Sequence, residues 1–361
     1  MTMERRVLEA RTATLAWLET MRMPRTPDGV SRISAAHDAA RWPGMLLPGT
    51  YNAVICRRLL GGEFADPDGL LRWLLAFRRG DGVFRIPGMK DDAVFKRPEQ
   101  GETWGYIDFH VTNYALGAVE AIAPEEMPYL EFARPFVNRA HLKAWLADRD
   151  LRDPWLEGNN IVNLGGFLMG LRGEGGGHAL DTLLHWHDYH QDPATGFWGV
   201  GQSLNETRLL HAMAGSMHNY HLYYALGRTL PYQDKAVDYA LSRPTEIDSA
   251  CIDVDLVDLL VHAHDAIDYR RDEIRGWLRE KLGALLGFQN ADGGFSDEVF
   301  GVRRQDGWVR GYEEPQGISN TFATWFRWIA IAMIADLLFP GLHDWHFRRM
   351  IGIGYRKERR R

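Results

Sequence analysis

Apolar residues recur along most of the chain with the period of an α-helix. In one clear case Ile274, Leu278, Leu282 and Leu285 fall at i, i+4, i+8 and i+11, so they form a single apolar stripe. Comparable one-sided helices are predicted at residues 5–22, 68–79, 138–149, 177–190 and 232–242. The chain shows almost none of the strict apolar–polar alternation that predicts strands. The pattern therefore predicts an all-α protein.

A second class of segment lies between these helices. Each has a polar first turn followed by a stretch that is apolar on nearly all sides. Six such segments begin at Tyr51, His110, Asn159, Ser216, Asp253 and Asn320. One-sided helices that alternate with all-round apolar helices indicate an outer ring packed on an inner ring. We therefore predict one (α/α)6 toroid, a single domain over residues 1–350, followed by a basic, solvated C-terminal tail at 351–361.

The connections between the helices are uneven in length. Those that lead from an outer to an inner helix include the long segments 23–50, 80–109, 191–215 and 290–319. In a toroid these connections all emerge at one end, and long loops on a rigid scaffold carry binding residues. We expect the functional site at the N-terminal ends of the inner helices.

Composition excludes several classes of protein. The 42 Lys and Arg against 48 Asp and Glu give a net charge of −6, which excludes a basic nucleic-acid binder, and 45% hydrophobic residues exclude a disordered chain. Two distant cysteines, Cys56 and Cys251, indicate a reducing compartment, and the charged N-terminal stretch does not look like a signal peptide, so we expect a cytoplasmic protein. The apolar run 328–339 is too short to span a bilayer. Because no metal-binding or nucleotide-binding motif is present, we predict no metal and no cofactor.

Two motifs resemble a known family. Residues 289–295 read QNADGGF, similar to the Q-x-x-D-G-G-F/W repeat of terpenoid cyclases and protein prenyltransferase β subunits, which are α/α toroids. Asp253-Val254-Asp255 is similar to the D-x-D-D acid motif of class II terpenoid cyclases, with Leu256 where that motif has its last Asp. The resemblance implies the toroid fold, which sugar-active hydrolases and lyases share in its six-hairpin form.

The residues themselves offer a set of proton donors and acceptors. Asp255, Asp258 and His262 fall at i, i+3 and i+7 on one helical face, and two carboxylates this close disfavour joint ionisation. A protonated acid beside an ionised one is what glycosidic cleavage requires. The candidate catalytic residues are Asp255 as the acid, Glu157 or Asp253 as the partner carboxylate, and His218 and His110 for proton transfer.

Polar and aromatic side chains near the expected mouth suit a substrate covered in hydroxyl groups. The candidate binding residues are Trp42, Trp104, Asp108, Trp155, Asn159, Asn160, Asp258, Trp308 and Asn320. Arginines in the same loops favour an anionic sugar. The competing interpretation is structural, since Asn, Asp and Ser at helix starts are ordinary N-caps.

Three functions follow from these observations. The first is a carbohydrate-active enzyme, a glycoside hydrolase or polysaccharide lyase with an oligosaccharide or small-molecule substrate. The second is a terpenoid cyclase-like enzyme in which Asp255 protonates an isoprenoid, as the family resemblance implies. The third is a non-catalytic glycan-binding toroid. An aromatic, dry cavity favours the cyclase, and a polar, open one favours the sugar enzyme.

Overall fold

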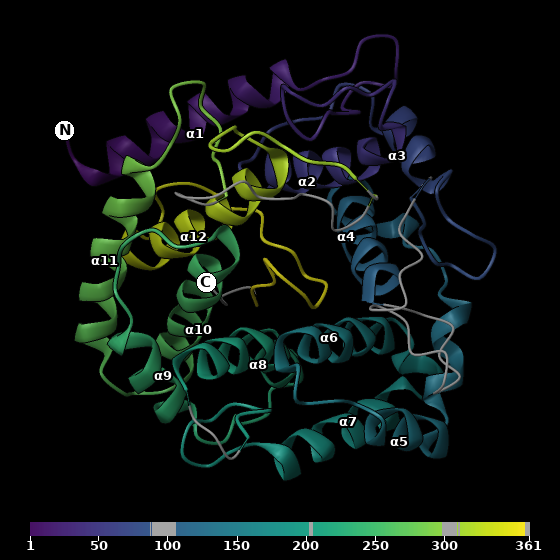
Figure 1. Ribbon diagram of the computed structural model, residues 1–361, viewed down its shortest axis with the longest axis vertical. Helices are drawn as coiled ribbons and strands as arrows, with labels where there is room; N and C mark the ends of the chain where they lie inside the picture. Colours follow the sequence, from purple (N-terminus) through teal and green to yellow (C-terminus); the bar gives the residue numbers. More distant parts are fainter. Residues whose placement is uncertain (87, 89–105, 202–204, 298–308, 310, 358–361) are drawn as a thin grey trace.

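The chain forms two concentric rings of helices (Figure 1). The computed structural model describes residues 1–86, 88, 106–201, 205–297, 309 and 311–357. The inner ring consists of α2 (Leu46–Leu59), α4 (Tyr106–Ile122), α6 (Pro154–Gly170), α8 (Glu206–Leu226), α10 (Ala250–Ala266) and α12 (Thr321–Leu338). The outer ring consists of α1 (Met3–Thr20), α3 (Pro67–Leu75), α5 (Arg139–Ala147), α7 (Gly176–His190), α9 (Gln233–Ser242) and α11 (Arg271–Gly287). Short 3₁₀ helices η1 (Pro43–Met45), η3 (Pro124–Glu126), η4 (Glu131–Val137) and η5 (Arg172–Glu174) lie in the connections. The predicted all-α toroid is confirmed.

The ring closes between its first and last hairpins. Each inner helix packs against the next, and α12 packs against α2. On the outside, the amide of Gln289 donates to Ala10 O (3.0 Å), Thr14 Oγ1 (3.0 Å) and Gly293 O (2.8 Å), so it joins the end of α11 to α1. The QNADGGF segment is thus a structural link between the outer helices of the first and last hairpins.

Five of the six inner helices begin earlier than the sequence pattern predicted, whereas α12 begins at Thr321, directly after Asn320. The side chains of Asp153, Asn205 and Ser249 accept hydrogen bonds from backbone N–H groups three residues later, which caps α6, α8 and α10. As a result α8 begins ten residues before Ser216, and α10 three residues before Asp253. Polar residues that we expected at the rim therefore lie one or more turns inside the ring.

Helices α6 and α8 approach each other at two glycines. A Cβ atom added to Gly215 would lie 2.0 Å from Pro154 O, and one added to Gly158 would lie 2.2 Å from Gly215 O. Only residues without side chains allow the two backbones to come so close. This contact sets the position of α8, which carries His218 and His221.

The C-terminal segment enters the ring rather than leaving it (Figure 1). Ile351, Ile353 and Tyr355 are 1%, 2% and 5% exposed. The guanidinium of Arg348 anchors the segment by donating to the backbone O (3.1 Å) and Oδ1 (2.9 Å) of Asn113 on α4. The solvated tail expected from the basic composition therefore does not hold for residues 351–356, because their alternating apolar side chains are buried in the centre of the ring.

Among the described residues, α12 is the one helix that is long and apolar enough to cross a bilayer. It lies in the inner ring, and 89% of it is buried by the rest of the chain. A buried core helix has this composition for the same physical reason as a membrane span, since both are surrounded by apolar groups.

Candidate active site

Asp255 is a buried carboxyl group without a hydrogen-bond partner. It lies on α10, it is 1% exposed, and within the described part of the chain neither of its oxygens accepts or donates a hydrogen bond. Nε2 of His218 lies 3.5 Å from Oδ1. Burial, and then the charge of Asp258, raise the pKa of Asp255 well above its usual value. Such a carboxyl group holds its proton at neutral pH and can act as an acid.

Asp258, one turn further along α10, is in the opposite state. Its Oδ1 lies 2.8 Å from Nε2 of His221 and 2.8 Å from Nδ1 of His262. Burial alone would raise the pKa of Asp258, but the two imidazoles outweigh it and the pKa is lowered below its ordinary value. The ring of Tyr224 stacks on that of His262 at 4.8 Å, and the ring of Tyr355 lies parallel to it at 6.3 Å.

The same three residues offer a donor set for a metal ion. Ligand atoms of His221, Asp258 and His262 lie within 4.8 Å of one another. Metal-bound imidazoles normally use their second nitrogen to bind a carboxylate or carbonyl group. Here Nδ1 of His221 and Nε2 of His262 have no hydrogen-bond partner among the described residues, while the inner nitrogens already contact the carboxylate. The arrangement fits a hydrogen-bonded cluster better than a metal centre.

Asp253 is part of a buried ion-pair network. Its carboxylate accepts from the ammonium of Lys281 on α11 and from the guanidinium of Arg327 on α12. All three side chains are 0–1% exposed. Ser249, not Asp253, caps the helix. Because both carboxylate oxygens of Asp253 are engaged by cations, we leave this residue out of the proposed chemistry.

Glu157 is likewise engaged inside the protein. It is 0% exposed, and it accepts from Arg149 NH1 (3.2 Å), the backbone N–H of Asp150 (3.0 Å) and the amide of Asn160 (3.1 Å). These contacts hold the start of α6 against the preceding loop. Glu157 and Asn160 are therefore structural in this geometry, and we do not assign them a role in catalysis or binding.

His110 and His218 are buried, neutral imidazoles. Burial lowers the pKa of His110 to about 3, and the charge of His218 lowers it further. Burial also lowers the pKa of His218 to about 3, followed by the effect of His221. Nδ1 of His110 lies 3.3 Å from the amide nitrogen of Asn163. At neutral pH both rings accept protons poorly, so neither is a good base, and His218 is a neutral polar neighbour of Asp255.

Three predicted polar binding residues make contacts within the protein. The carboxylate of Asp108 accepts from Arg85 Nε (2.9 Å) and NH2 (3.2 Å). The amide of Asn159 donates to Trp155 O one turn earlier (2.9 Å). Asn320 caps α12 by accepting from the backbone N–H of Ala323 (2.7 Å). Asn320 thus follows the structural interpretation of polar residues at helix starts.

The predicted aromatic binding residues are not brought to one place by any contact in the described structure. Trp42 packs edge-on against Tyr312, with ring centroids 6.1 Å apart. Trp155 is tilted against His211 at 5.3 Å. Two further predicted residues, Trp104 and Trp308, lie outside the described residues.

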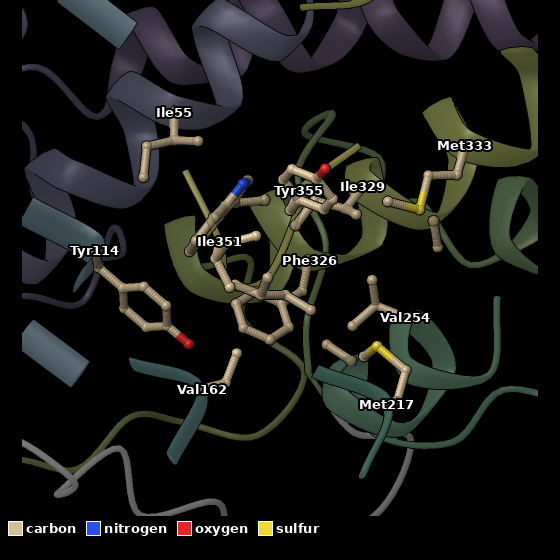
Figure 2. Packing of buried hydrophobic residues seen from close by; sticks show 14 of the residues in the cluster. Ile55, Tyr114, Val162, Met217, Val254, Phe326, Ile329, Met333, Ile351 and Tyr355 are labelled. Carbon is tan, nitrogen blue, oxygen red and sulfur yellow. The ribbon is translucent and has the colours of Figure 1, made fainter. Parts of the chain in front are cut away.

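The centre of the ring is apolar and aromatic. Side chains from α2, α4, α6, α8, α10 and α12 and from the C-terminal segment gather there, and Figure 2 labels Ile55, Tyr114, Val162, Met217, Val254, Phe326, Ile329, Met333, Ile351 and Tyr355. Tyr114 packs edge-on against Trp325 at 5.2 Å and against Tyr51 at 5.6 Å. The side chains that Figure 2 labels are apolar or aromatic, so this part of the centre offers little that could bind hydroxyl groups.

Sequence reasoning missed the two cations that neutralise Asp253. Both carried a signal. Lys281 falls seven residues after Ile274, on the apolar stripe of α11, and Arg327 interrupts an apolar run in α12. A lone cation at a core position is expected to pair with a buried carboxylate.

A cavity of about 1030 Å³ lies at the other end of the toroid. It is formed by the C-terminal ends of α2, α4 and α12 and by the C-terminal segment, and its lining includes Arg58, Glu120, Asp336 and Arg348. Asp255 does not line it. The cavity is therefore separate from the candidate acid.

Comparison with known proteins supports the fold. No protein family and no curated protein matches the sequence. Two solved structures of variants of the type II terpene cyclase MstE from Scytonema do match. One contains the substrate geranylgeranyl dihydroxybenzoate (15% identity, TM-score 0.51) and one contains the product merosterolic acid A (14% identity, TM-score 0.53). Each match covers 93% of this chain and 99% of the other. This chain thus has the same α/α toroid fold as these two structures, as its motifs implied.

These findings correct the first functional hypothesis. We expected a carbohydrate-active enzyme because polar residues crowd the starts of the inner helices. The matched structures instead hold an isoprenoid substrate and its product. In this chain most of the polar residues on which that hypothesis depended are occupied by caps and ion pairs, and the centre of the ring is apolar. The carbohydrate hypothesis is wrong.

Proposed function

We propose that this protein is an enzyme of the terpenoid cyclase type, which protonates a double bond of an isoprenoid small molecule through Asp255. The observation that carries the proposal is the carboxyl group of Asp255, which is 1% exposed and has no hydrogen-bond partner in the described structure. A group that donates a proton to an alkene must carry that proton at neutral pH. Burial without a hydrogen-bond partner stabilises the protonated form of Asp255 over its carboxylate, so this group meets that condition.

The proposed step is balanced by the substrate itself. The O–H bond of Asp255 breaks, its proton forms a new C–H bond with one alkene carbon, and the π electrons of the alkene supply that bond. The other alkene carbon becomes a carbocation, which the next double bond of the chain attacks to close a ring. The final carbocation loses a proton to water, and Asp255 regains one from solvent.

Carbocations inside the ring require electron-rich neighbours. Tyr114, Trp325 and Phe326 form one aromatic group on α4 and α12, with Tyr114 and Trp325 at 5.2 Å and Trp325 and Phe326 at 5.1 Å. Aromatic faces attract cations with about 0.5 to 2 kcal/mol each, most strongly where water is excluded. The neutral imidazole of His218 adds no positive charge beside the acid.

The test is a deuterium-labelling experiment. Purified protein is incubated in D2O with squalene, geranylgeraniol, geranylgeranyl diphosphate and geranylgeranyl dihydroxybenzoate, and products are analysed by mass spectrometry. We expect a cyclised product that carries deuterium at the carbon protonated in the first step. Asp255→Asn should abolish it, whereas Asp268→Asn, which changes an aspartate with a 92% exposed side chain, should leave it unchanged.

Three results would refute the proposal. They are the absence of cyclised product from every isoprenoid, a product without deuterium at that carbon, and full turnover by a folded Asp255→Asn variant.

A further inference from the structure

The second aspartate on the same face of α10 has no role in the proposed reaction. Asp258 is 1% exposed, and its carboxylate contacts the buried imidazoles of His221 and His262 at 2.8 Å each. Burying an ionisable cluster is costly unless its members stabilise one another. Apolar side chains at these three positions of α8 and α10 would be buried at lower cost.

We propose that the contacts of His221 and His262 with Asp258 fix a negative charge on Asp258, and that this charge keeps the neighbouring carboxyl group of Asp255 protonated. This inference rests on the proposed function of Asp255. Asp258 is then a positioning residue, because it acts through Asp255 and does not itself touch the substrate. Its two imidazole partners donate to the carboxylate and so hold the negative charge on Asp258 rather than on Asp255.

The geometry accounts for the direction and size of the effect. Residues three apart on a helix have Cβ atoms about 5–6 Å apart. Two negative charges at that distance, in a protein with an effective dielectric constant of about 20, disfavour joint ionisation by about 2 pH units. Asp255 has one neighbour at 3.5 Å, the imidazole of His218, whereas Asp258 has two at 2.8 Å. The shared proton therefore stays on Asp255.

Other titratable groups near the pair do not change this assignment. On α11 and α12, the cations Lys281 and Arg327 are bound by Asp253. On α8 and the C-terminal segment, Tyr224 and Tyr355 are neutral phenols at ordinary pH, because burial raises the pKa of Tyr224 well above its usual value and that of Tyr355 to about 12. None of these groups places a free positive charge between the two aspartates.

The experiment follows the proton on Asp255 without any substrate. Infrared spectroscopy detects the carbonyl stretch of a buried protonated carboxyl group, and the band of Asp255 is the one that disappears in Asp255→Asn. We expect this band in the wild-type protein at neutral pH. In Asp258→Asn its titration midpoint should fall by about 2 pH units. The matched control Asp268→Asn, at a side chain that is 92% exposed, should leave the midpoint unchanged.

Each outcome distinguishes the two proposals. A wild-type protein without any protonated carboxyl band would refute Asp255 as the acid, and with it the proposed function. If the band is present but its midpoint is the same in Asp258→Asn, only the present inference fails. Should Asp258→Asn not fold, as judged by circular dichroism, Asp255→Asn still decides. A carboxyl band that persists in that variant would place the shared proton on Asp258 and overturn the inference.

The metal alternative is tested on the same samples. The content of divalent metal in the purified protein is measured by mass spectrometry, before and after treatment with a chelator. We expect less than a stoichiometric amount in both cases. One equivalent of metal that is lost in His262→Gln would overturn the proposed role of Asp258.

Discussion

Replacing Asp253 by Asn should destabilise the protein strongly without removing the acid. Asp253 is the one carboxylate that joins Lys281 on α11 and Arg327 on α12, and all three side chains are 0–1% exposed. The amide of Asn has the same size but no charge, so the variant would leave two buried cations without their counterion. The perturbation is therefore electrostatic rather than steric.

The magnitude follows from burial. Removing one partner of a buried ion pair costs about 3–5 kcal/mol, whereas an exposed pair is worth about 0.3–0.5 kcal/mol. The exposed pair Arg5–Glu9 on α1, with side chains 73% and 49% exposed, supplies the matched control Glu9→Gln. With an unfolding entropy of about 2.1 cal/mol/K per residue, a loss of 3–5 kcal/mol lowers the Tm of a chain of this length by about 4–7 °C.

Urea denaturation followed by circular dichroism measures the free energy of unfolding of both variants. We expect a loss of at least about 3 kcal/mol for Asp253→Asn and less than about 1 kcal/mol for Glu9→Gln. Equal, small losses would refute the reasoning that Asp253 is a structural counterion. The infrared band of Asp255 should persist in the folded Asp253→Asn variant, and its disappearance would show that Asp253 takes part in the acid.

Three further predictions follow from burial and packing. Gly215→Ala should lower the free energy of unfolding by about 1–3 kcal/mol, because the new Cβ would lie 2.0 Å from a carbonyl oxygen of α6. The control Gly276→Ala on α11, where a Cβ would have nothing within 4 Å, should raise the free energy of unfolding by up to about 1 kcal/mol. The opposite order of the two variants in urea denaturation would contradict this packing. Deletion of residues 351–361 should destabilise the protein by several kcal/mol and increase binding of a hydrophobic dye, because it removes buried side chains from the centre of the ring. Unchanged stability would mean that the segment does not fill the interior. Acid should destabilise the protein, because buried histidines with folded-state pKa values of about 3 take up protons near pH 6.5 only when the chain is unfolded. Each such histidine should lower the free energy of unfolding by about 2 kcal/mol between pH 7 and pH 5. A free energy of unfolding that does not change over that range would be inconsistent with neutral buried rings. The histidines concerned are His110, His187 and His218.

The sequence by itself determined the helices and their arrangement in two rings. The one-sided stripe of Ile274, Leu278, Leu282 and Leu285 gave an outer helix within a few residues of the observed α11, and the all-round apolar segments gave the inner ring. This is possible because helical periodicity is local: side chains three and four residues apart share a face whatever surrounds them. The alignment of Asp255, Asp258 and His262 on one face of α10 was predictable for the same reason.

Only the tertiary structure decided what each of these polar residues does. The sequence predicts Asp255 as the acid and Glu157 or Asp253 as its partner carboxylate. In the structure Asp253 is neutralised by cations from two other helices and Glu157 by Arg149, whereas Asp255 is neutralised by no cation among the described residues. The protonation state of a buried carboxyl group depends on charges within a few ångströms, and those charges come from residues far away in the chain. The fate of the C-terminal segment was decided in the same way, because a short basic stretch is solvated unless a partner exists for it. Here the apolar centre of the ring, which no local pattern reveals, provides that partner.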